Sequence, residues 1–464
     1  MRTTVGSIVV VLLAVPGALL IGLTSTTTAD PALAAAAATA LIVGGTGDSD
    51  PASELNYLPN ARDYYIAPFN PSCTAAGGCN LVGIMYPAQL WPIPWDNYGG
   101  LTGKKFDVSV ADGVTNLNIE LQNLLASPDP PDSIVIFGYS QGARVATVEK
   151  IALAAASPDV QDNVSFVLIG NPNRPNGGIL TRFGFLGHVP IIDVTFGQPT
   201  PTDTSMPTTD IAYEYDGVAD FPEYPIDLLA DINAFAGYWY VHPTMLNPLD
   251  GDPTGPYEYT PDQLEAAILD PANRQTYGDT TYITIPTLNL PILQPLRDFA
   301  TATNTTALIT PLIDLIQPTL KVLIDLGYNR SINPGVPTEA GLIPPIDPVT
   351  LTAQLITSVQ QGVQAALTDL GMQPVTPLAP PSPPNSSTLA PAETPAIVAS
   401  ATRSGDISTP TGAIKASGPP SGSAGATATV ATTSEPPGTL ARSPVANATH
   451  LHHGHRIEPV ARRR

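Results

Sequence analysis

The chain has 464 residues, of which 40 are acidic and 19 basic, so its formal net charge is −21. This charge excludes a protein that binds nucleic acid through a basic surface, because phosphates attract cations. A hydrophobic content of 43% is enough for a buried core, whereas 52 prolines indicate that part of the chain does not fold. Two cysteines exclude a disulfide-dense scaffold and a four-cysteine zinc site.

Residues 1–34 have the pattern of an export signal. Arg2 precedes an apolar run over 5–23, and Ala32-Leu33-Ala34 fits a cleavage site. The run is also long enough for an uncleaved membrane anchor, so a signal peptide and a signal anchor both stay open. Either one predicts a body outside the cytoplasm, where Cys73 and Cys79 are expected to form a small disulfide loop.

Between residues 40 and 372, strand-like and helix-like segments alternate. Apolar or β-branched runs predict strands over 40–43, 81–86, 133–137, 164–169 and 211–215, and helical spacing predicts helices over 112–125 and 143–156. Alternation of this kind predicts an α/β fold with a mostly parallel central sheet flanked by helices.

The stretch 286–327 is apolar, punctuated by proline and mostly helical in its spacing. Its apolar spacing favours a C-terminal helical layer packed on the sheet as core. The alternative is a cap that binds an acyl chain beside the active site.

The composition changes near Pro374, and the segment 374–464 consists mainly of Pro, Ser, Thr, Ala and Gly. Such a segment buries too little apolar surface to offset its ordering entropy, so a disordered tail is predicted. Its end, over 450–464, is rich in His and Arg. A solvated tail explains these histidines better than a metal site, because nothing nearby would fix ligand geometry.

The most informative motif is Gly138-Tyr139-Ser140-Gln141-Gly142, which fits G-x-S-x-G. It stands after a predicted strand and before a predicted helix, where a sharp turn would project a serine hydroxyl. Ser140 is therefore the candidate nucleophile. The backbone N–H of Gln141, at the start of the helix, is the first candidate oxyanion donor.

A serine nucleophile needs a base, and outside the tail the chain has only His188 and His242. In α/β hydrolases the order is serine, acid, histidine, so the base is expected late in the domain. This order favours His242. His188 follows Ser140 closely in a Gly-rich loop and fits a structural or substrate-contacting role.

The acid is expected in the turn after the predicted strand 211–215, where Asp216 and Asp220 compete. Asp220 lies three residues past Gly217, which leaves room for the loop to bring it to the imidazole. Asp216 lies at the strand end, where it is suited to cap the turn. The pattern favours Asp220, with Asp216 as the alternative acid. Its role would be to hold the histidine tautomer and stabilise the imidazolium.

The second oxyanion donor is expected in the loop after an early strand, which points to Thr46 in Gly44-Gly45-Thr46-Gly47. A phosphate-binding loop does not fit, because G-x-G-x-x-G is absent and no Lys follows as in a P-loop. The sequence contains no zinc or calcium motif, so neither a metal nor another cofactor is expected.

Five segments together resemble the PE-PPE domain of mycobacteria: 41–47 (LIVGGTG), 138–142 (GYSQG), 170–178 (GNPNRPNGG), 215–222 (YDGVADFP) and 285–291 (IPTLNLP). That domain is a cutinase-like serine α/β hydrolase, and the resemblance covers about residues 41–342. It implies a triad at Ser140, Asp220 (or Asp216) and His242. A signal-like segment stands where many members carry an N-terminal PE or PPE helical segment.

The resemblance implies a secreted or cell-envelope serine esterase that hydrolyses acyl esters through an acyl-enzyme. One alternative is an acyltransferase that moves fatty acyl chains between envelope glycolipids, with trehalose-type acceptors. Another is a non-catalytic wall-binding protein, against which the order of nucleophile, acid and base counts. The expected partners are an acyl-ester or glycolipid substrate and a membrane or cell-wall surface, not nucleic acid.

Overall fold

The computed structural model describes residues 38–249 and 255–372. The predicted export signal over 1–34 and the predicted tail over 374–464 therefore lie outside the described residues. The predicted domain over 40–372 falls almost wholly within them.

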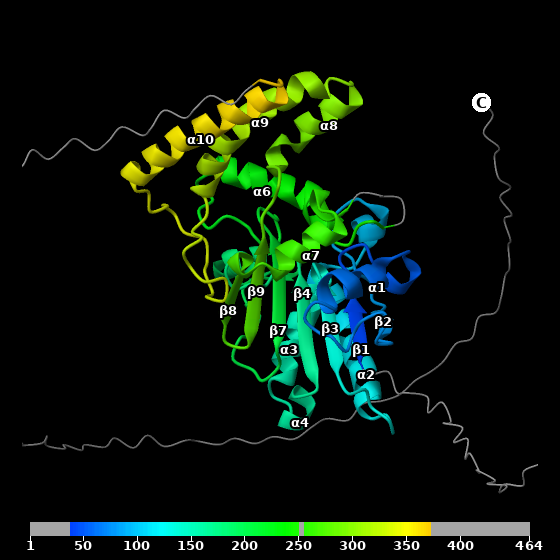
Figure 1. The fold of residues 1–464 in the computed structure, drawn as a ribbon. Coiled ribbons are helices and arrows are strands. Elements are labelled where there is room, and N and C mark those ends of the chain that lie inside the picture. Colours follow the sequence, from blue (N-terminus) through cyan, green and yellow to red (C-terminus); the bar gives the residue numbers. More distant parts are fainter. Residues whose placement is uncertain (1–37, 250–254, 373–464) are drawn as a thin grey trace, which may run out of the picture. The chain divides into compact units, whose positions relative to one another are not determined.

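The body is built on a seven-stranded sheet in the order β2-β1-β3-β4-β7-β9-β8 (Figure 1). Every neighbouring pair is parallel except β8 and β9, so the predicted mostly parallel sheet is confirmed. Its strands are β1 (Thr39–Val43), β2 (Asn80–Ile84), β3 (Ile134–Tyr139), β4 (Val164–Ile169), β7 (Thr208–Tyr213), β9 (Thr280–Ile285) and β8 (Arg274–Tyr277). A separate antiparallel pair joins β5 (His188–Val189) to β6 (Val194–Thr195).

The central strands are apolar throughout because both faces of the sheet are covered. Alternate residues of β1 enter two different cores, Ala40 and Ile42 on one face and Leu41 and Val43 on the other. Continuous apolar runs such as 134–137 therefore form buried strands, as the sequence predicted.

Helices cover both faces. One face packs against α2 (Phe106–Leu125) and α3 (Gln141–Leu153), and the opposite core includes residues of α1 (Tyr57–Asn60) and α7 (Pro261–Leu269). The remaining short helices are α4 (Pro158–Gln161) and α5 (Ile179–Arg182). Helix α7 begins with a capping box in which Thr260 and Gln263 satisfy each other's backbone amides.

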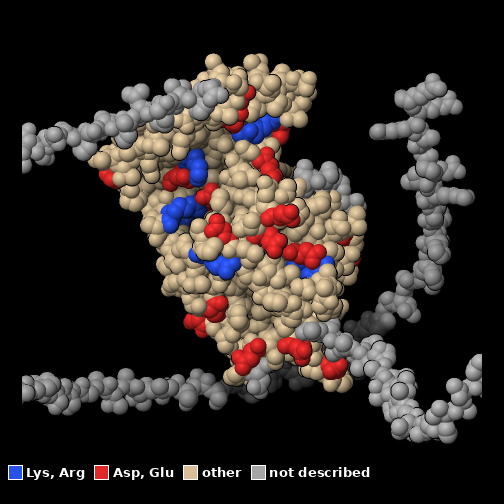
Figure 2. Space-filling model, in the orientation of Figure 1, with Lys and Arg blue, Asp and Glu red and all other residues tan. Residues whose placement is uncertain are grey.

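A helical layer, defined here as α8 (Gln294–Ala302), α9 (Thr306–Asp325) and α10 (Pro348–Asp369), lies over α6 (Leu228–Tyr240) and not on the sheet (Figure 1). Most of its outer surface in Figure 2 carries neither acidic nor basic side chains. Only 17% of the most apolar window of α9 is buried, and among the described helices α9 is the one long and apolar enough to cross a membrane. The prediction of a core layer on the sheet is therefore wrong for most of this stretch.

Two further differences from the predicted elements concern strands. The antiparallel pair of β8 and β9 has no counterpart in the sequence prediction, and β7 begins at Thr208 and ends at Tyr213, two residues before the predicted end. Consequently the turn with the two candidate acids begins earlier than expected.

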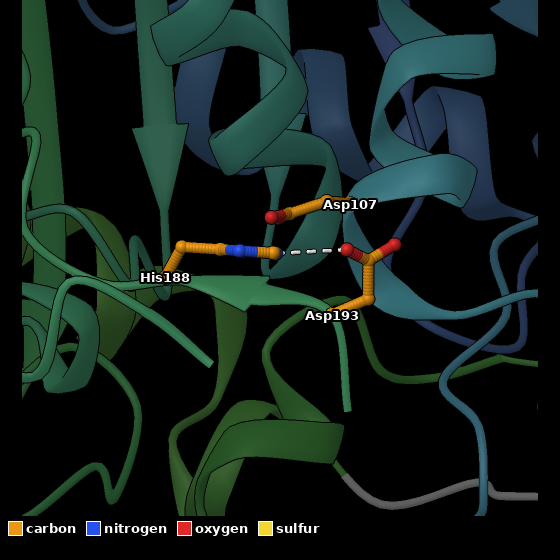
Figure 3. Close-up of side chains that lie close together, drawn as sticks. All are labelled: Asp107, His188 and Asp193. Carbon is orange, nitrogen blue, oxygen red and sulfur yellow. Dashed lines mark hydrogen bonds and ion pairs between the residues drawn. The ribbon is translucent and has the colours of Figure 1, made fainter. Parts of the chain in front are cut away.

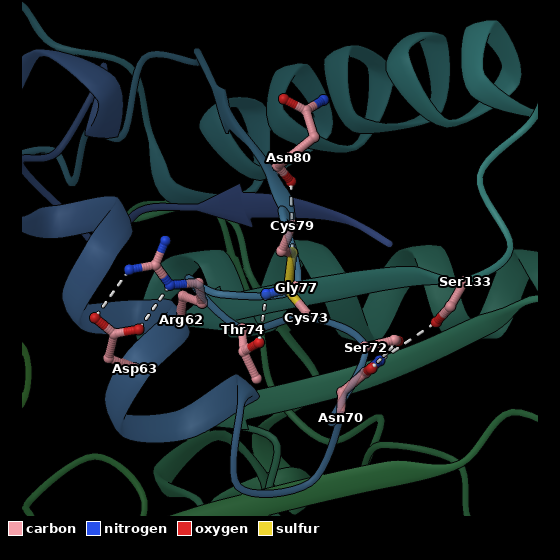
Figure 4. Close-up of a disulfide and its surroundings, with 10 residues drawn as sticks. All are labelled: Arg62, Asp63, Asn70, Ser72, Cys73, Thr74, Gly77, Cys79, Asn80 and Ser133. Carbon is pink, nitrogen blue, oxygen red and sulfur yellow. Dashed lines mark hydrogen bonds and ion pairs between the residues drawn. A yellow bond between two sulfur atoms is a disulfide. The ribbon is translucent and has the colours of Figure 1, made fainter. Parts of the chain in front are cut away.

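A disulfide joins Cys73 to Cys79 and closes a small loop just before β2 (Figure 4). Within this loop the Gly77 amide donates to the Thr74 hydroxyl at 2.9 Å. Beside it, Arg62 pairs with Asp63.

The strand order reverses direction between β1 and β3, because the chain leaves β1 for β2 on one side and then returns to β3 on the other. At such a point the loops after the two strands diverge and leave a crevice at the carboxyl edge of the sheet, where α/β proteins bind ligands. The loops there are Gly44–Gly47 after β1 and Ser140 after β3.

Candidate active site

Ser140 occupies a sharp turn between β3 and α3. Its backbone has φ +56° and ψ −117°, a conformation that costs a non-glycine residue energy and is held by its surroundings. The turn is fixed by the Ser140 amide, which donates to the Ile169 carbonyl at 3.1 Å. The strained turn leaves the Ser140 side chain half-buried at the carboxyl edge of the sheet, as a nucleophile elbow requires.

The two glycines of the motif allow the backbone to approach closely. A Cβ at Gly138 would lie 2.6 Å from the Gly142 carbonyl oxygen, and one at Gly142 would overlap the Val43 carbonyl at the end of β1. Helix α3 can therefore begin directly beside the loop after β1 only because both positions lack side chains.

His242 begins the short 3-10 turn His242–Thr244 that follows α6. Its Nε2 lies 2.8 Å from Ser140 Oγ. The imidazole is buried, its ring stacks on Tyr238, and the Tyr139 hydroxyl donates to the His242 carbonyl. These contacts fix a base within hydrogen-bond reach of the candidate nucleophile.

Asp216 is the carboxylate that faces His242. His242 Nδ1 lies 2.9 Å from Asp216 Oδ1 and 3.1 Å from Oδ2, and Oδ1 also accepts the Val218 amide at 2.9 Å. Asp216 is completely buried. A carboxylate in this place holds Nδ1 protonated and leaves Nε2 to accept the serine proton.

The preference for Asp220 as the acid is not supported by this geometry. Asp220 accepts the Tyr215 amide at 2.8 Å and pairs through both oxygens with Arg330, one of these bonds being 2.7 Å long. Burial has the largest single influence and would raise the pKa of Asp220, but the Arg330 guanidinium, the Tyr215 amide and Arg174 together hold that pKa below its ordinary value. Among the described residues no hydrogen bond joins Asp220 to His242, so Asp216 replaces it as the candidate acid.

Gln141 and Thr46 lie on the two loops that border Ser140. Gln141 is the first residue of α3, so its backbone amide lies at the helix N-terminus. Its side chain is held by hydrogen bonds with Gln89 and Ser109. The Thr46 loop touches the nucleophile, since a Cβ on neighbouring Gly45 would lie 3.2 Å from Ser140 Cβ. No backbone carbonyl of the described residues accepts either amide, so both amides stay candidates for oxyanion donors.

His188 lies apart from this arrangement, in β5. Its Nε2 lies 2.9 Å from Asp193 Oδ1, and Asp107 lies beside them (Figure 3). Within the described ranges these three form the one group with the ligand types and spacing for a metal ion. Asp107 Oδ2 already accepts the Thr195 hydroxyl at 2.6 Å, so internal contacts account for much of the cluster.

Sequence reasoning missed a residue that shapes the position of the base. Gly170, directly after β4, has φ +54°, and a Cβ there would lie 2.7 Å from His242 Cε1. Its place in the 170–178 motif was noted, but its contact with His242 depends on tertiary structure. Tyr139 and Tyr238 were missed as supports of His242 for the same reason.

A family model described as the PE-PPE domain matches residues 77–329, more than half of the chain. The chain belongs to the PE-PPE domain family. Its relatives in Mycobacterium tuberculosis include "Uncharacterized PPE family protein PPE42", 38% identical over 72% of this chain and 52% of the relative. "Esterase PE16" is 39% identical over 68% of this chain and 54% of the relative.

Another relative from Mycobacterium tuberculosis is "Diacyltrehalose acyltransferase Chp2", 27% identical over 58% of this chain and 69% of that protein. The chain spans about half the length of the first curated relatives it matches. A solved structure of a cutinase-like protein from Cryptococcus sp. aligns with a TM-score of 0.26 and 19% identity, over 39% of this chain and 78% of that one. The fold description therefore rests on the sheet topology of this chain itself.

Proposed function

We propose that the protein is a serine esterase that hydrolyses acyl esters through an acyl-enzyme on Ser140. The observation that carries the proposal is the continuous hydrogen-bonded series from Ser140 Oγ to His242 to Asp216, at 2.8 Å and 2.9 Å. Its similarity to a relative named as an esterase supports the same class of reaction. The export pattern over 1–34 supports a site of action in the cell envelope or outside the cell.

In the first step Ser140 Oγ attacks the ester carbonyl while His242 Nε2 takes the hydroxyl proton. The Gln141 and Thr46 amides stabilise the oxyanion, and Asp216 stabilises the imidazolium. The imidazolium then gives its proton to the leaving alcohol, and the acyl group stays on Ser140. Water resolves this intermediate by the same route, its proton passing to His242 and then back to Ser140.

A second candidate function is acyl transfer, in which a sugar hydroxyl replaces water in the second step. Similarity to a relative named as a diacyltrehalose acyltransferase favours it, and the apolar helical layer is compatible with acylated acceptors. Both reactions share the acyl-enzyme and differ only in the group that reaches it.

The test is hydrolysis of p-nitrophenyl esters of increasing chain length by the full chain, with Ser140→Ala as the comparison. We expect the substitution to lower turnover by about 10⁶-fold, the scale seen when a triad nucleophile is removed. Without hydrolysis in either protein, an acylated glycolipid and a free sugar serve as donor and acceptor. Transfer that depends on Ser140 would replace the esterase proposal by acyl transfer, and no reaction in either assay would favour a non-catalytic wall-binding protein.

A further inference from the structure

The loop after β1 ends in a carboxyl group that has no role in the triad. Asp48 Oδ2 accepts the Gly45 amide at 3.2 Å and the Tyr57 hydroxyl at 3.2 Å. The Gly45 amide also donates to the Tyr57 hydroxyl at 3.3 Å. Tyr57, in α1, is completely buried, so the three hydrogen bonds join Asp48 and Gly45 to a fixed side chain outside the loop.

Gly45 connects this hydrogen-bonded group to the nucleophile. The position of a Cβ on Gly45 is 3.2 Å from Ser140 Cβ and 3.4 Å from Asp48 Oδ2, so Ser140 and Asp48 lie close to the same residue. The rest of the loop is held by the Tyr86 hydroxyl, which donates to the Gly44 carbonyl at 2.7 Å, and by the Gly47 amide, which donates to the Ala88 carbonyl at 2.8 Å.

The Gly45 amide is thus occupied, and the Thr46 amide is the next donor along the loop. We propose that Asp48 is a positioning residue for acyl-enzyme formation, which through Tyr57 and the Gly45 amide holds the loop Gly44–Gly47 so that the Thr46 amide faces the oxyanion. This inference rests on the proposed function, because it assumes an oxyanion formed by attack of Ser140.

The charge of Asp48 matters because of where it lies. Burial, and after it the nearby Glu54 carboxylate and a hydrogen bond to it, raise the pKa of Asp48 to about 8. The other titratable groups around it are tyrosines, Tyr57, Tyr86, Tyr98 and Tyr139, whose pKa values burial also raises. At neutral pH the carboxyl group is therefore largely protonated.

The position of Asp48 beside the nucleophile determines whether activity rises or falls with pH. The neutral carboxyl group adds no charge beside the oxyanion, whereas the ionised group repels the negative charge of the transition state. Activity is therefore highest below the pKa of Asp48 and falls as the pH rises through it. We expect a loss of about tenfold, the effect of one like charge at several ångströms in a partly screened site.

The test compares pH profiles of three variants between about pH 6 and about pH 10, a range that spans the pKa of Asp48. Asp48→Asn keeps an oxygen acceptor and cannot ionise, so the alkaline loss of kcat should disappear. Glu54→Gln removes the like charge, so the alkaline loss should move to lower pH. Asp50→Asn is the matched control, since Asp50 lies on the same segment and its side chain caps the turn Pro51–Ser53.

Two readouts are used, kcat for a p-nitrophenyl ester and the rate at which a fluorophosphonate labels Ser140, which needs no natural substrate. A retained alkaline loss in Asp48→Asn, or an unmoved one in Glu54→Gln, would overturn the role of Asp48. Asp48→Ala should lower kcat at every pH and change KM less. Recovery of kcat in Asp48→Asn at neutral pH separates a positioning role from misfolding. If the esterase proposal itself is wrong, Ser140 will not be labelled in any variant, and this outcome differs from a wrong role for Asp48.

Discussion

The turn at Ser140 and the helical layer over α6 differ in how closely their side chains and backbone are packed. Around Ser140 the backbone segments approach so closely that a Cβ at Gly142 would overlap the Val43 carbonyl. In the helical layer, large apolar side chains such as Leu308 and Leu312 remain more than half exposed, at 70% and 57%. The turn has no room for a side chain at this glycine, and the helical layer leaves apolar surface in contact with water.

The helical layer has this property because its two long helices meet through small residues. Gly362 of α10 lies against the Leu315 carbonyl of α9, and the Ser358 hydroxyl donates to Thr319 at 3.2 Å. Because the contact line uses small side chains, much of the leucine, isoleucine and valine surface of both helices faces outward. The Ser140 turn is therefore sensitive to small changes in geometry. The outer helical layer tolerates substitution, and changes to its exposed side chains alter mainly what the layer can contact.

After the loss of the nucleophile itself in Ser140→Ala, the largest effect is expected from Asp216→Asn. The amide would hold His242 in the wrong tautomer, so turnover should fall by about 10⁴-fold while the fold is retained. The measurement is kcat/KM for a soluble p-nitrophenyl ester, with circular dichroism to check folding. This substitution tests the geometry of the Ser140 region without changing side-chain volume.

Asp220→Asn is the matched control, in the same turn and equally conservative. It weakens the pair with Arg330, so we expect a loss of about 2 kcal/mol in the free energy of unfolding, with turnover of the folded protein within about tenfold of the original. A larger loss of turnover in Asp220→Asn than in Asp216→Asn would contradict the assignment of the acid.

The next largest effect is expected from a substitution that tests the close packing around His242. Gly170→Ala adds one carbon 2.7 Å from His242 Cε1, so the imidazole must move, and a displacement of about 1 Å can cost about 100-fold in rate. Gly187→Ala is the control, because its φ of +57° nearly equals the +54° of Gly170 and nothing lies within 4 Å of the added Cβ. Both variants place an alanine at a positive φ of nearly the same size, so equal losses of kcat would show that contact with His242 is unimportant.

The regular parts of this fold were predictable from local pattern. Buried strands such as β1 and β3 are continuous apolar runs, and the G-x-S-x-G motif locates the nucleophile because the strand and helix around it have clear periodicity. His242 followed from elimination, since His188 lies too close to Ser140 in sequence for the expected order. These inferences use only neighbours along the chain.

The choice between Asp216 and Asp220 depends on partners distant in sequence. Arg330, which pairs with Asp220, lies 110 residues further along the chain, and no local pattern links the two. The direction of the turn is set by α6, because a Cβ at Gly217 would overlap the Ala234 carbonyl. Amphipathic spacing likewise predicted that the segment 286–327 is covered, but it does not reveal that α9 meets α10 through small residues.

The smallest effect on the chemistry is expected from Leu308→Gln combined with Leu312→Gln in α9. Both side chains are largely exposed, so the free energy of unfolding should change by less than about 1 kcal/mol, and turnover of a short soluble ester should stay within about twofold. With a long-chain ester in dispersed lipid we expect about tenfold lower turnover, because even partial burial of the two leucines in lipid is worth about 1–2 kcal/mol. Ile151→Gln, at an exposed apolar position on α3, is the control and should affect neither substrate. Equal losses on both substrates would show that the helical layer supports the site and would remove the contrast with the Ser140 turn, whereas a loss confined to the lipid substrate would assign the exposed leucines to contact with acyl chains.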